Sequence, residues 1–334
     1  MAALAASARP ALAEHPAGPP LRLAAAPAAF PPAVLDGVAA RTGCSVQIVR
    51  PLTPGALPGE DADLVELAGA DAGPLIASGR LAVIEDGSVS GIGDVPGRLR
   101  DAVRDEAGGL RAVPYLWSPQ LLLARRAVYG EQPPTSLRTL FSRRGAARAA
   151  LPDSPLELAL AARYLGVGDA FALDRDELAA AREVLAPAEP LLRFYAHAST
   201  LRSLFRTGRV DLALGNPAQL GDQRPDVVAV TPDEGTIATE RVLGIVSGTK
   251  RVICARRVAG ALLAPFAQAR LAAARGLVSV RSATCSVLSR IACTALGNAL
   301  SKTLPNSSVA VHPLAMDGVT GWPEWVGEWV LLHG

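Results

Sequence analysis

The stretch TPDEGTIATERVLGIV, residues 231–246, combines an acidic turn, a short polar run and an apolar strand. Thr239, Glu240 and Arg241 form the polar run, and an apolar segment begins at Val242. The Asp-Glu-Gly sequence at 233–235 predicts a solvent-exposed turn. A polar run at the start of a buried strand can present its side chains to a cleft, either as ligand contacts or as a catalytic acid and base.

Strands alternate with helices on the N-terminal side of this stretch. Strands are predicted at 21–27, 44–51, 62–67 and 210–216, and helices at 30–43, 174–192 and 199–209. Asp174 and Glu177 have the spacing of a capping box. Alternating strands and helices predict an α/β fold with parallel sheets that carry helices on their faces.

The alternation forms two units, at roughly 21–112 and 116–238. The segment after 243 has too few strands for a third unit, so we expect it to complete the first. The predicted domains are a residual signal or linker at 1–20, lobe 1 at 21–114 plus 243–334, and lobe 2 at 115–242. Two hinge crossings then join the lobes, and the opening stretch lies on one of them. A cleft between lobes is a favoured place for a ligand.

Composition excludes several classes of function. The chain has 334 residues, 50% of them hydrophobic, and a formal net charge of +2. A balanced charge argues against a nucleic-acid partner. No CxxC pair occurs and the four histidines are scattered, so no metal site is expected. The sequence indicates no cofactor either.

The four cysteines are expected to be buried thiols. Cys285 and Cys293 can meet only if the chain bends between them, because eight residues of straight helix span about 12 Å. Whether they pair stays open.

The N-terminus resembles a shortened export signal. It is rich in alanine, and Ala11 to Ala13 have the small-x-small pattern of a signal-peptidase site, but the basic and apolar regions are short. A flexible alanine-rich tail is the alternative. No run of eighteen apolar residues occurs, so no membrane span is expected.

Six segments in a fixed order resemble the extracytoplasmic solute-binding proteins of bacterial ABC importers, in particular the spermidine/putrescine-binding branch. They cover roughly 60–250 and are DADLVELAGADAGPLIASGRLAVIE, LRAVPYLWSPQLLLARRAV, PPTSLRTLF, PDSPLELALAARYLG, LFRTGRVDLALGN and VVAVTPDEGTIATERVLGIV. The resemblance implies a two-lobe periplasmic-binding-protein-like fold with two hinge crossings and an interlobe cleft. It also implies a periplasmic or extracytoplasmic monomer that binds a small molecule, docks on a membrane permease and performs no catalysis.

Most of the polyamine site of this family is replaced. The resemblance places a tryptophan of the relatives on Thr239 and their amine-binding aspartate on Arg241, beside Glu240. A second acid of the relatives falls on Leu156, whereas Asp153 keeps the first. Arginine presents a planar fork that suits a carboxylate or phosphate, so we expect an anionic or other small polar ligand. The eight candidate ligand-binding residues are Phe30, Asp71, Trp117, Asp153, Asn216, Thr239, Glu240 and Arg241.

Structural roles compete with these assignments. Asp153 can serve as a helix N-cap, and Trp117 can pack at the hinge. Glu240 and Arg241 can pair with each other. Three tryptophans near the C-terminus, at 322, 325 and 329, are expected to pack on one helical face.

Two other functions remain open. One is an enzyme on the same fold that uses a cleft cysteine, Cys44 or Cys254, as nucleophile. No Cys/His arrangement supports it. The other is a cytoplasmic ligand sensor, which requires a DNA-binding or signalling module for which the chain has no room.

Overall fold

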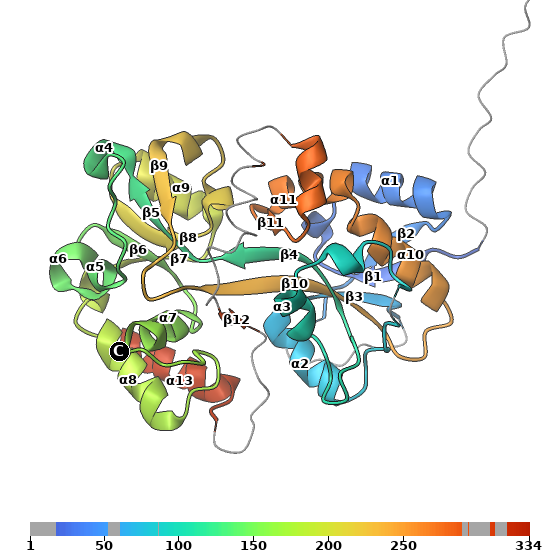
Figure 1. Ribbon diagram of the computed structural model, residues 1–334, viewed down its shortest axis with the longest axis horizontal. Helices are drawn as coiled ribbons and strands as arrows, with labels where there is room; N and C mark the ends of the chain where they lie inside the picture. The colour runs from blue at the N-terminus through green and yellow to red at the C-terminus, as the bar shows by residue number, and fades with distance from the viewer. Residues whose placement is uncertain (1–17, 53–60, 86, 289–292, 294–307, 311–318) are drawn as a thin grey trace, which may run out of the picture.

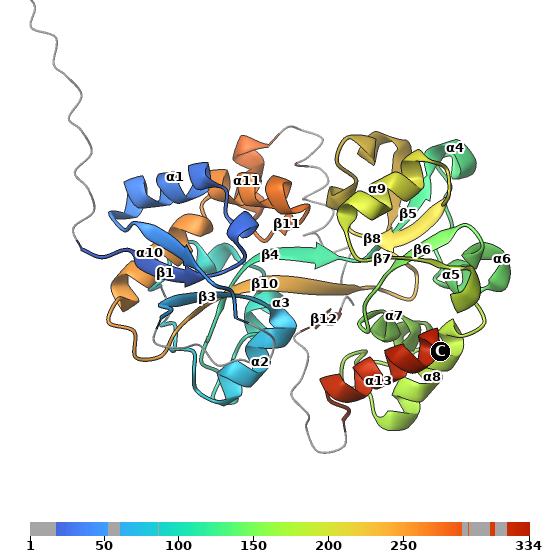
Figure 2. The same ribbon diagram turned by 180° about the vertical axis from the view of Figure 1, so that it is seen from behind.

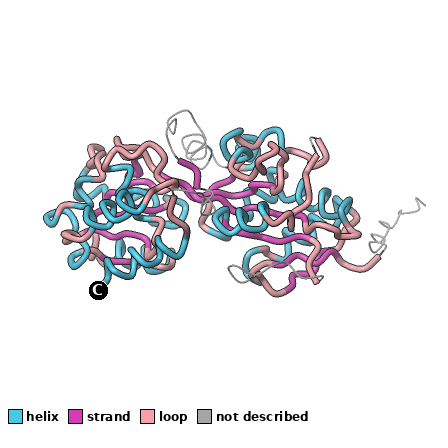
Figure 3. The backbone as a smooth tube through the Cα atoms, turned by 90° about the horizontal axis from the view of Figure 1, so that it is seen from below, coloured by secondary structure: helices cyan, strands magenta, loops and turns pink. Residues whose placement is uncertain are grey.

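Two α/β lobes, each built round its own sheet, are joined by long strands in the computed structural model (Figure 1, Figure 2). The structure describes residues 18–52, 61–85, 87–288, 293, 308–310 and 319–334. From below, the two bodies are separated by a waist that strands cross (Figure 3). The predicted two-lobe α/β fold is confirmed.

The sheet of lobe 1 has seven strands in the order β11-β4-β10-β3-β1-β2, with β12 paired to β10. β1, β2 and β3 are parallel, as predicted, and β10 is antiparallel to β3 and β4 because it returns from lobe 2. The strands are β1 (Leu21–Ala24), β2 (Val46–Val49), β3 (Leu64–Ala68), β4 (Val113–Pro119), β10 (Ile237–Ile245), β11 (Val278–Ser279) and β12 (Ser308–Ala310).

Helices cover both faces of this sheet. Helices α1, α10 and α11 pack together on one face, and α2 and α3 lie on the other (Figure 1). The helical elements of lobe 1 are η1 (Pro27–Ala29), α1 (Pro32–Thr42), α2 (Gly69–Ala77), η2 (Ile92–Asp94), α3 (Gly97–Asp101), α10 (Val252–Leu262), α11 (Pro265–Arg275) and η5 (Ser282–Val287).

The sheet of lobe 2 has five strands in the order β7-β6-β8-β5-β9. Its strands are β5 (Leu121–Arg125), β6 (Ala149–Pro152), β7 (Arg193–Tyr195), β8 (Leu212–Gly215) and β9 (Val227–Val230). Alternate residues enter different cores: Leu122 and Leu212 pack on one face, and Leu123 and Ala213 on the other.

Lobe 2 also has helices on both faces of its sheet. They are α4 (Arg126–Tyr129), α5 (Arg138–Phe141), α6 (Arg143–Ala146), α7 (Glu157–Tyr164), α8 (Arg175–Leu185), η3 (Glu189–Leu191), α9 (Ala198–Arg206), η4 (Pro217–Asp226) and α13 (Trp322–His333). The predicted capping box starts α8: Asp174 Oδ1 accepts from the Glu177 N–H at 2.8 Å, and Glu177 Oε2 accepts from the Asp174 N–H at 3.0 Å.

The last helix differs from the expectation that the chain after 243 completes lobe 1. Helices α10 and α11 do contribute to the core of lobe 1, but α13 places Trp325 and Trp329 in the core of lobe 2. Trp322 was expected to pack on the same face and is instead 41% exposed. The chain therefore passes from lobe 1 to lobe 2 once more after β11.

The acidic turn at 233–235 is hydrogen-bonded to residues 135–137 of lobe 2. Asp233 Oδ2 accepts from the Thr135 hydroxyl at 2.6 Å, and Glu234 accepts from the Ser136 hydroxyl at 2.5 Å and the Leu137 N–H at 3.0 Å. The sequence predicted a turn that interacts with solvent. The turn is present and Asp233 is exposed, and the two acids also hold the chain in front of α5.

No single helix in the described part of the chain is long and apolar enough to span a membrane. The pair α10 and α11 meets that criterion together, but the two helices are bent by 73° at their junction. The expected export signal lies outside the described residues, as does most of the region after 288.

Candidate functional site

Strands β4 and β10 run side by side between the lobes, and their alternation divides the candidate residues between two faces. Glu240 pairs with Trp117, Thr239 with Ser118, and Arg241 with both Leu116 and Ala68. Successive side chains of a strand point to opposite faces. Thr239 and Arg241 therefore share one face, and Glu240 lies on the other.

On its face of the sheet, Arg241 binds a buried acid that the sequence analysis did not single out. Arg241 Nε lies 2.6 Å from Glu66 Oε1, and Arg275 Nη1, from the end of α11, lies 2.9 Å from the same oxygen. The Tyr115 hydroxyl donates to this oxygen at 3.0 Å. We call Glu66, Tyr115, Arg241 and Arg275 the arginine cluster.

Electrostatics keep Glu66 ionised in the arginine cluster. Burial alone raises its pKa, but the hydrogen bond from Arg241 and the charges of Arg241 and Arg275 outweigh burial, and the pKa lies below its usual value. Burial also disfavours the Arg241 charge, and Glu66 reverses that effect and raises the pKa of Arg241. Two guanidinium groups against one carboxylate leave one unit of positive charge.

Arg241 has donors to spare. Its Nε binds Glu66, and its two Nη groups have no hydrogen-bond partner among the residues that the structure describes. Paired guanidinium N–H groups match a carboxylate or phosphate in geometry and charge. The arginine cluster can therefore hold an anionic group without first breaking an internal bond.

Two further candidates lie beside the arginine cluster. Phe30 is buried and stacks on Tyr115, with ring centroids 5.9 Å apart. Asp71, in the first turn of α2, reaches solvent; partial burial raises its pKa, and the Arg241 charge offsets this only in part. Phe30 supports Tyr115 in this conformation, and ligand contacts by Phe30 and Asp71 stay predictions.

Asn216 links the two lobes on the Arg241 side of the sheet. It follows β8 and is fully buried. Its Nδ2 donates to the Ser118 hydroxyl on β4 at 3.3 Å and to the Gly276 carbonyl after α11 at 3.4 Å, and its Oδ1 accepts from the Ala218 N–H at 2.9 Å. Asn216 therefore binds a residue, Gly276, that directly follows Arg275 of the arginine cluster.

Glu240 and Trp117 form a separate buried pair on the opposite face. Both are fully buried, and neither the Glu240 carboxylate nor Trp117 Nε1 has a hydrogen-bond partner in the described part of the chain. Burial raises the pKa of Glu240 to about 8. A Cβ at Gly69 would lie 2.5 Å from Glu240 Oε1, so only glycine leaves room for the carboxyl group.

The interpretation of Glu240 and Arg241 as a mutual ion pair is therefore wrong. Arg241 pairs with Glu66, which lies 175 residues earlier in the sequence. The signal for Glu66 was present: it is the one charged residue in the strand LVELA. Charged residues are rarely buried without a partner.

Asp153 contacts the C-terminal helix and does not cap α7, whose N-cap is Leu156. Its Oδ1 accepts from Trp329 Nε1 at 3.2 Å and lies 4.0 Å from His333 Nε2. Glu157, at the start of α7, is a second buried carboxyl that the sequence analysis missed. Neither of its oxygens has a hydrogen-bond partner within the described residues, and burial raises its pKa well above the usual value.

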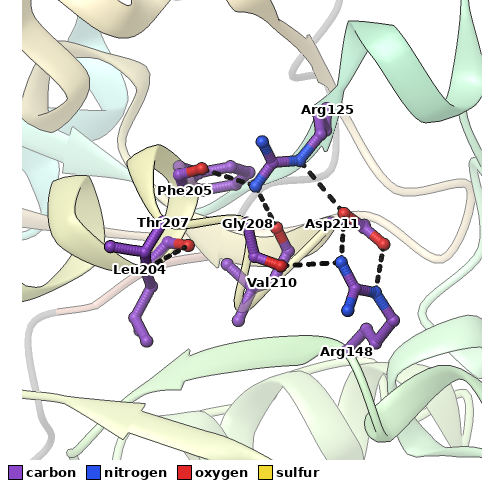
Figure 4. Close-up of polar contacts among 8 residues, drawn as sticks. All are labelled: Arg125, Arg148, Leu204, Phe205, Thr207, Gly208, Val210 and Asp211. Atoms are coloured by element: carbon purple, nitrogen blue, oxygen red, sulfur yellow. Dashed lines mark hydrogen bonds and ion pairs between the residues drawn. The ribbon is translucent and has the colours of Figure 1, made fainter.

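A charge cluster in lobe 2 also joins two arginines to one carboxylate, but it has a structural role (Figure 4). Asp211 binds both Arg125, at 3.0 Å, and Arg148. The same arginines donate to main-chain carbonyls, Arg125 to Phe205 and Val210 and Arg148 to Gly208. These bonds fix the loop between α9 and β8, because both guanidinium groups bind main-chain carbonyls as well as Asp211.

All four cysteines form disulfides, Cys44 with Cys254 and Cys285 with Cys293. The expectation of four thiols is wrong, because the chain brings α1 beside α10 and bends between 285 and 293. The disulfides leave no thiol for the proposed cleft nucleophile. Among the described residues, no group of three or more His, Cys, Asp or Glu side chains could hold a metal ion.

Comparisons with known proteins identify the family. The family model for bacterial extracellular solute-binding proteins matches residues 52–284, which is more than half of the chain. The chain belongs to this family. A search of curated protein sequences finds no match.

Solved structures show the same fold at low sequence identity. A putative spermidine/putrescine ABC transporter protein from Listeria monocytogenes has a TM-score of 0.74 and 15% identity, over 94% of this chain and 98% of the other. A spermidine/putrescine substrate-binding protein from Streptococcus pneumoniae has a TM-score of 0.73 and 14% identity, over 95% and 98%. A GABA receptor has a TM-score of 0.72 and 14% identity, over 95% and 98%.

Proposed function

We propose that this protein is the extracytoplasmic substrate-binding component of an ABC importer and that it delivers a small molecule to a membrane permease as a monomer. Its family and its two-lobe fold support this role. Lobes joined by crossing strands can close over a ligand by hinge motion. Disulfides are typical of oxidising compartments, and the two in this chain fit a periplasmic or other extracytoplasmic location.

The ligand proposed for this protein is a small polar molecule with an anionic group. The observation that carries this is the arginine cluster, which has two guanidinium groups, one carboxylate and unpaired Nη donors on Arg241 among the described residues. Relatives that bind polyamines use an acid where this chain has Arg241. Arginine there repels an ammonium group and attracts a carboxylate or phosphate.

One solved structure with a similar fold binds a molecule of this ligand class. The same architecture occurs in a GABA receptor, and γ-aminobutyrate carries a carboxylate as well as an ammonium group. Phe30 and Asp71 lie beside the arginine cluster, Thr239 shares the face of Arg241, and Asn216 binds Gly276 next to Arg275. An anionic group at this cluster contacts Arg275, which precedes the Gly276 carbonyl that Asn216 of lobe 2 binds. We therefore expect the ligand to favour lobe closure.

The alternative of an enzyme with a cleft cysteine has no support. Its nucleophile requires a free thiolate, and Cys44 and Cys254 are bound to each other.

A thermal-shift screen over organic acids, amino acids, phosphate compounds and polyamines tests the proposal. A ligand at 100 times its Kd stabilises the protein by about 2.7 kcal/mol. We expect shifts with organic acids, and we expect Arg241→Gln to abolish those shifts. Arg50→Gln is the matched control, because Arg50 is an exposed arginine of lobe 1 outside the arginine cluster. Tight binding of spermidine or putrescine with indifference to organic acids would refute the proposed ligand class.

A further inference from the structure

A cavity opens at the end of lobe 1 that is farthest from the β4–β10 crossing. It has a volume of about 1140 Å³ and lies beyond the end of β10, beside the starts of β1 and β3. Its walls come from residues 19–20, 62–63, 78–80 and 246–251, and from Arg22 and Gln47. Small-molecule sites commonly have volumes of about 300–1,000 Å³, so this cavity is large enough for a small ligand.

Charge in this cavity is strongly unbalanced. Its lining includes four cations, Arg22, Arg80, Lys250 and Arg251, and one acid, Asp63. Asp63 is already engaged, because its Oδ2 accepts from the Arg22 main-chain N–H at 2.9 Å and lies 3.4 Å from Arg22 Nε. Cations gathered round one concave surface create a positive potential that attracts anions.

The hydrogen-bond donors that remain in the cavity are mostly cationic. The hydroxyl of Ser78 donates to the Pro74 carbonyl, that of Ser247 to the Gly79 carbonyl and that of Thr249 to Asp63 Oδ1, each at 2.8 Å. A hydroxyl has one proton to donate. These three side chains are therefore left as acceptors, and the side-chain donors open to a ligand are the basic groups and the Gln47 amide.

Arg80 and Lys250 supply such donors. Both side chains are exposed, and neither has a hydrogen-bond or ion-pair partner among the described residues. Their two loops are held together, since the Ser247 N–H donates to the Arg80 carbonyl at 2.9 Å. The two cations therefore lie on fixed loops and not on independent flexible segments, which lowers the entropic cost of binding.

We propose that this cavity is a binding site for a phosphate-bearing anion. Several cations on separate segments suit a multiply charged ligand, and arginine and lysine together are typical phosphate contacts. The site lies at the opposite end of lobe 1 from the arginine cluster and does not depend on which molecule that cluster binds. The phosphate belongs either to a soluble phosphate compound or to a lipid headgroup.

Isothermal titration of the full chain with inorganic pyrophosphate tests the site. We expect Arg80→Ala and Lys250→Ala each to weaken binding by about tenfold, since a hydrogen bond to a charged group contributes at least that much. Arg50→Ala is the control, because Arg50 is an exposed arginine of lobe 1 outside the cavity. Arg50→Ala and Arg241→Gln are both expected to leave pyrophosphate binding unchanged.

A second arm distinguishes the two sources of phosphate. The protein is sedimented with vesicles of phosphatidylglycerol and, separately, of phosphatidylcholine. Binding to phosphatidylglycerol alone that is lost in Arg80→Ala and Lys250→Ala identifies a lipid headgroup, and pyrophosphate binding without vesicle binding identifies a soluble compound. The proposal is overturned if the protein binds neither pyrophosphate nor phosphatidylglycerol. It is also overturned if neither Arg80→Ala nor Lys250→Ala weakens the binding.

Discussion

Asn216 of lobe 2 donates a hydrogen bond of 3.4 Å to the carbonyl of Gly276 in lobe 1. Gly276 directly follows Arg275, which binds Glu66 in the arginine cluster. The contact between the lobes and the candidate anion site are therefore adjacent along the chain. A ligand that moves Arg275 also acts on the contact that holds the lobes together.

Asn216→Ala is expected to favour an open arrangement of the lobes. The substitution removes both Nδ2 bonds and the bond from the Ala218 N–H. Small-angle X-ray scattering of the ligand-free protein should show a larger radius of gyration. Ser118→Ala removes one of these bonds and keeps the Gly276 contact, so it should change the radius less. Equal scattering from Asn216→Ala and the unmodified protein would contradict a latch role for Asn216.

Glu66→Ala is expected to destabilise lobe 1. It leaves two guanidinium groups close together without their shared carboxylate, and removal of one partner of a buried ion pair costs about 3–5 kcal/mol. Denaturant unfolding measures the loss. Tyr115→Phe removes two hydrogen bonds, the one its hydroxyl donates to Glu66 and the one it accepts from Arg275, and should cost about 2 kcal/mol. Glu85→Ala removes an exposed partner of Arg256 and should have little effect. If Glu66→Ala and Glu85→Ala have the same free energy of unfolding, the arginine cluster does not stabilise lobe 1.

Glu240 should make the protein less stable as the pH rises from about 5 to 8. Its pKa is about 8 in the folded protein, against 4.5 in an unfolded chain. Between these values the folded state holds a proton that the unfolded state has released, so stability falls with rising pH, at up to about 1.4 kcal/mol per pH unit. Thermal unfolding across this range measures the slope.

Glu240→Gln removes one of two buried carboxyl groups with a raised pKa, the other being Glu157, and should reduce that slope. The variant should gain melting temperature at pH 8 relative to the unmodified protein. Glu183→Gln alters an exposed acid and serves as the control. The same slope in Glu240→Gln as in the control would show that another group titrates.

The two disulfides should contribute unequally to stability. Cys44–Cys254 closes a loop with a sequence separation of 210, and Cys285–Cys293 one of 8. Loop-closure entropy favours the long loop by about 3 kcal/mol. The double substitution of Cys44 and Cys254 by serine should therefore lower Tm more than the same change at Cys285 and Cys293. A larger loss from the second pair would show that local packing near Cys285 outweighs loop entropy.

The fold was predictable because local signals agreed with one another. Strands alternate with helices, Gly43 ends α1 in a left-handed conformation with a φ of 68°, and Asp174 caps α8. These signals act over a few residues and do not depend on tertiary contacts. The passage of the C-terminal segment to lobe 2 was missed, because it depends on where Trp325 and Trp329 find a complementary apolar surface.

The site was predictable only in part. Strand alternation already implies that Glu240 and Arg241 face apart. The partner of Arg241 was not accessible from local sequence, since Glu66 reaches it through the pairing of β3 with β10. Asp153 was assigned to the ligand because its turn resembles that of relatives, and its contact with Trp329 arises from a helix 176 residues later in the chain.

Because α13 packs in lobe 2, the distance between the two ends of the described chain depends on how far the lobes are open. Gly18 precedes β1 in lobe 1, and Gly334 follows α13 in lobe 2 (Figure 1). A donor fluorophore at one position and an acceptor at the other are attached to different lobes. Their energy transfer would report the opening and closing of the lobes without any label inside either core.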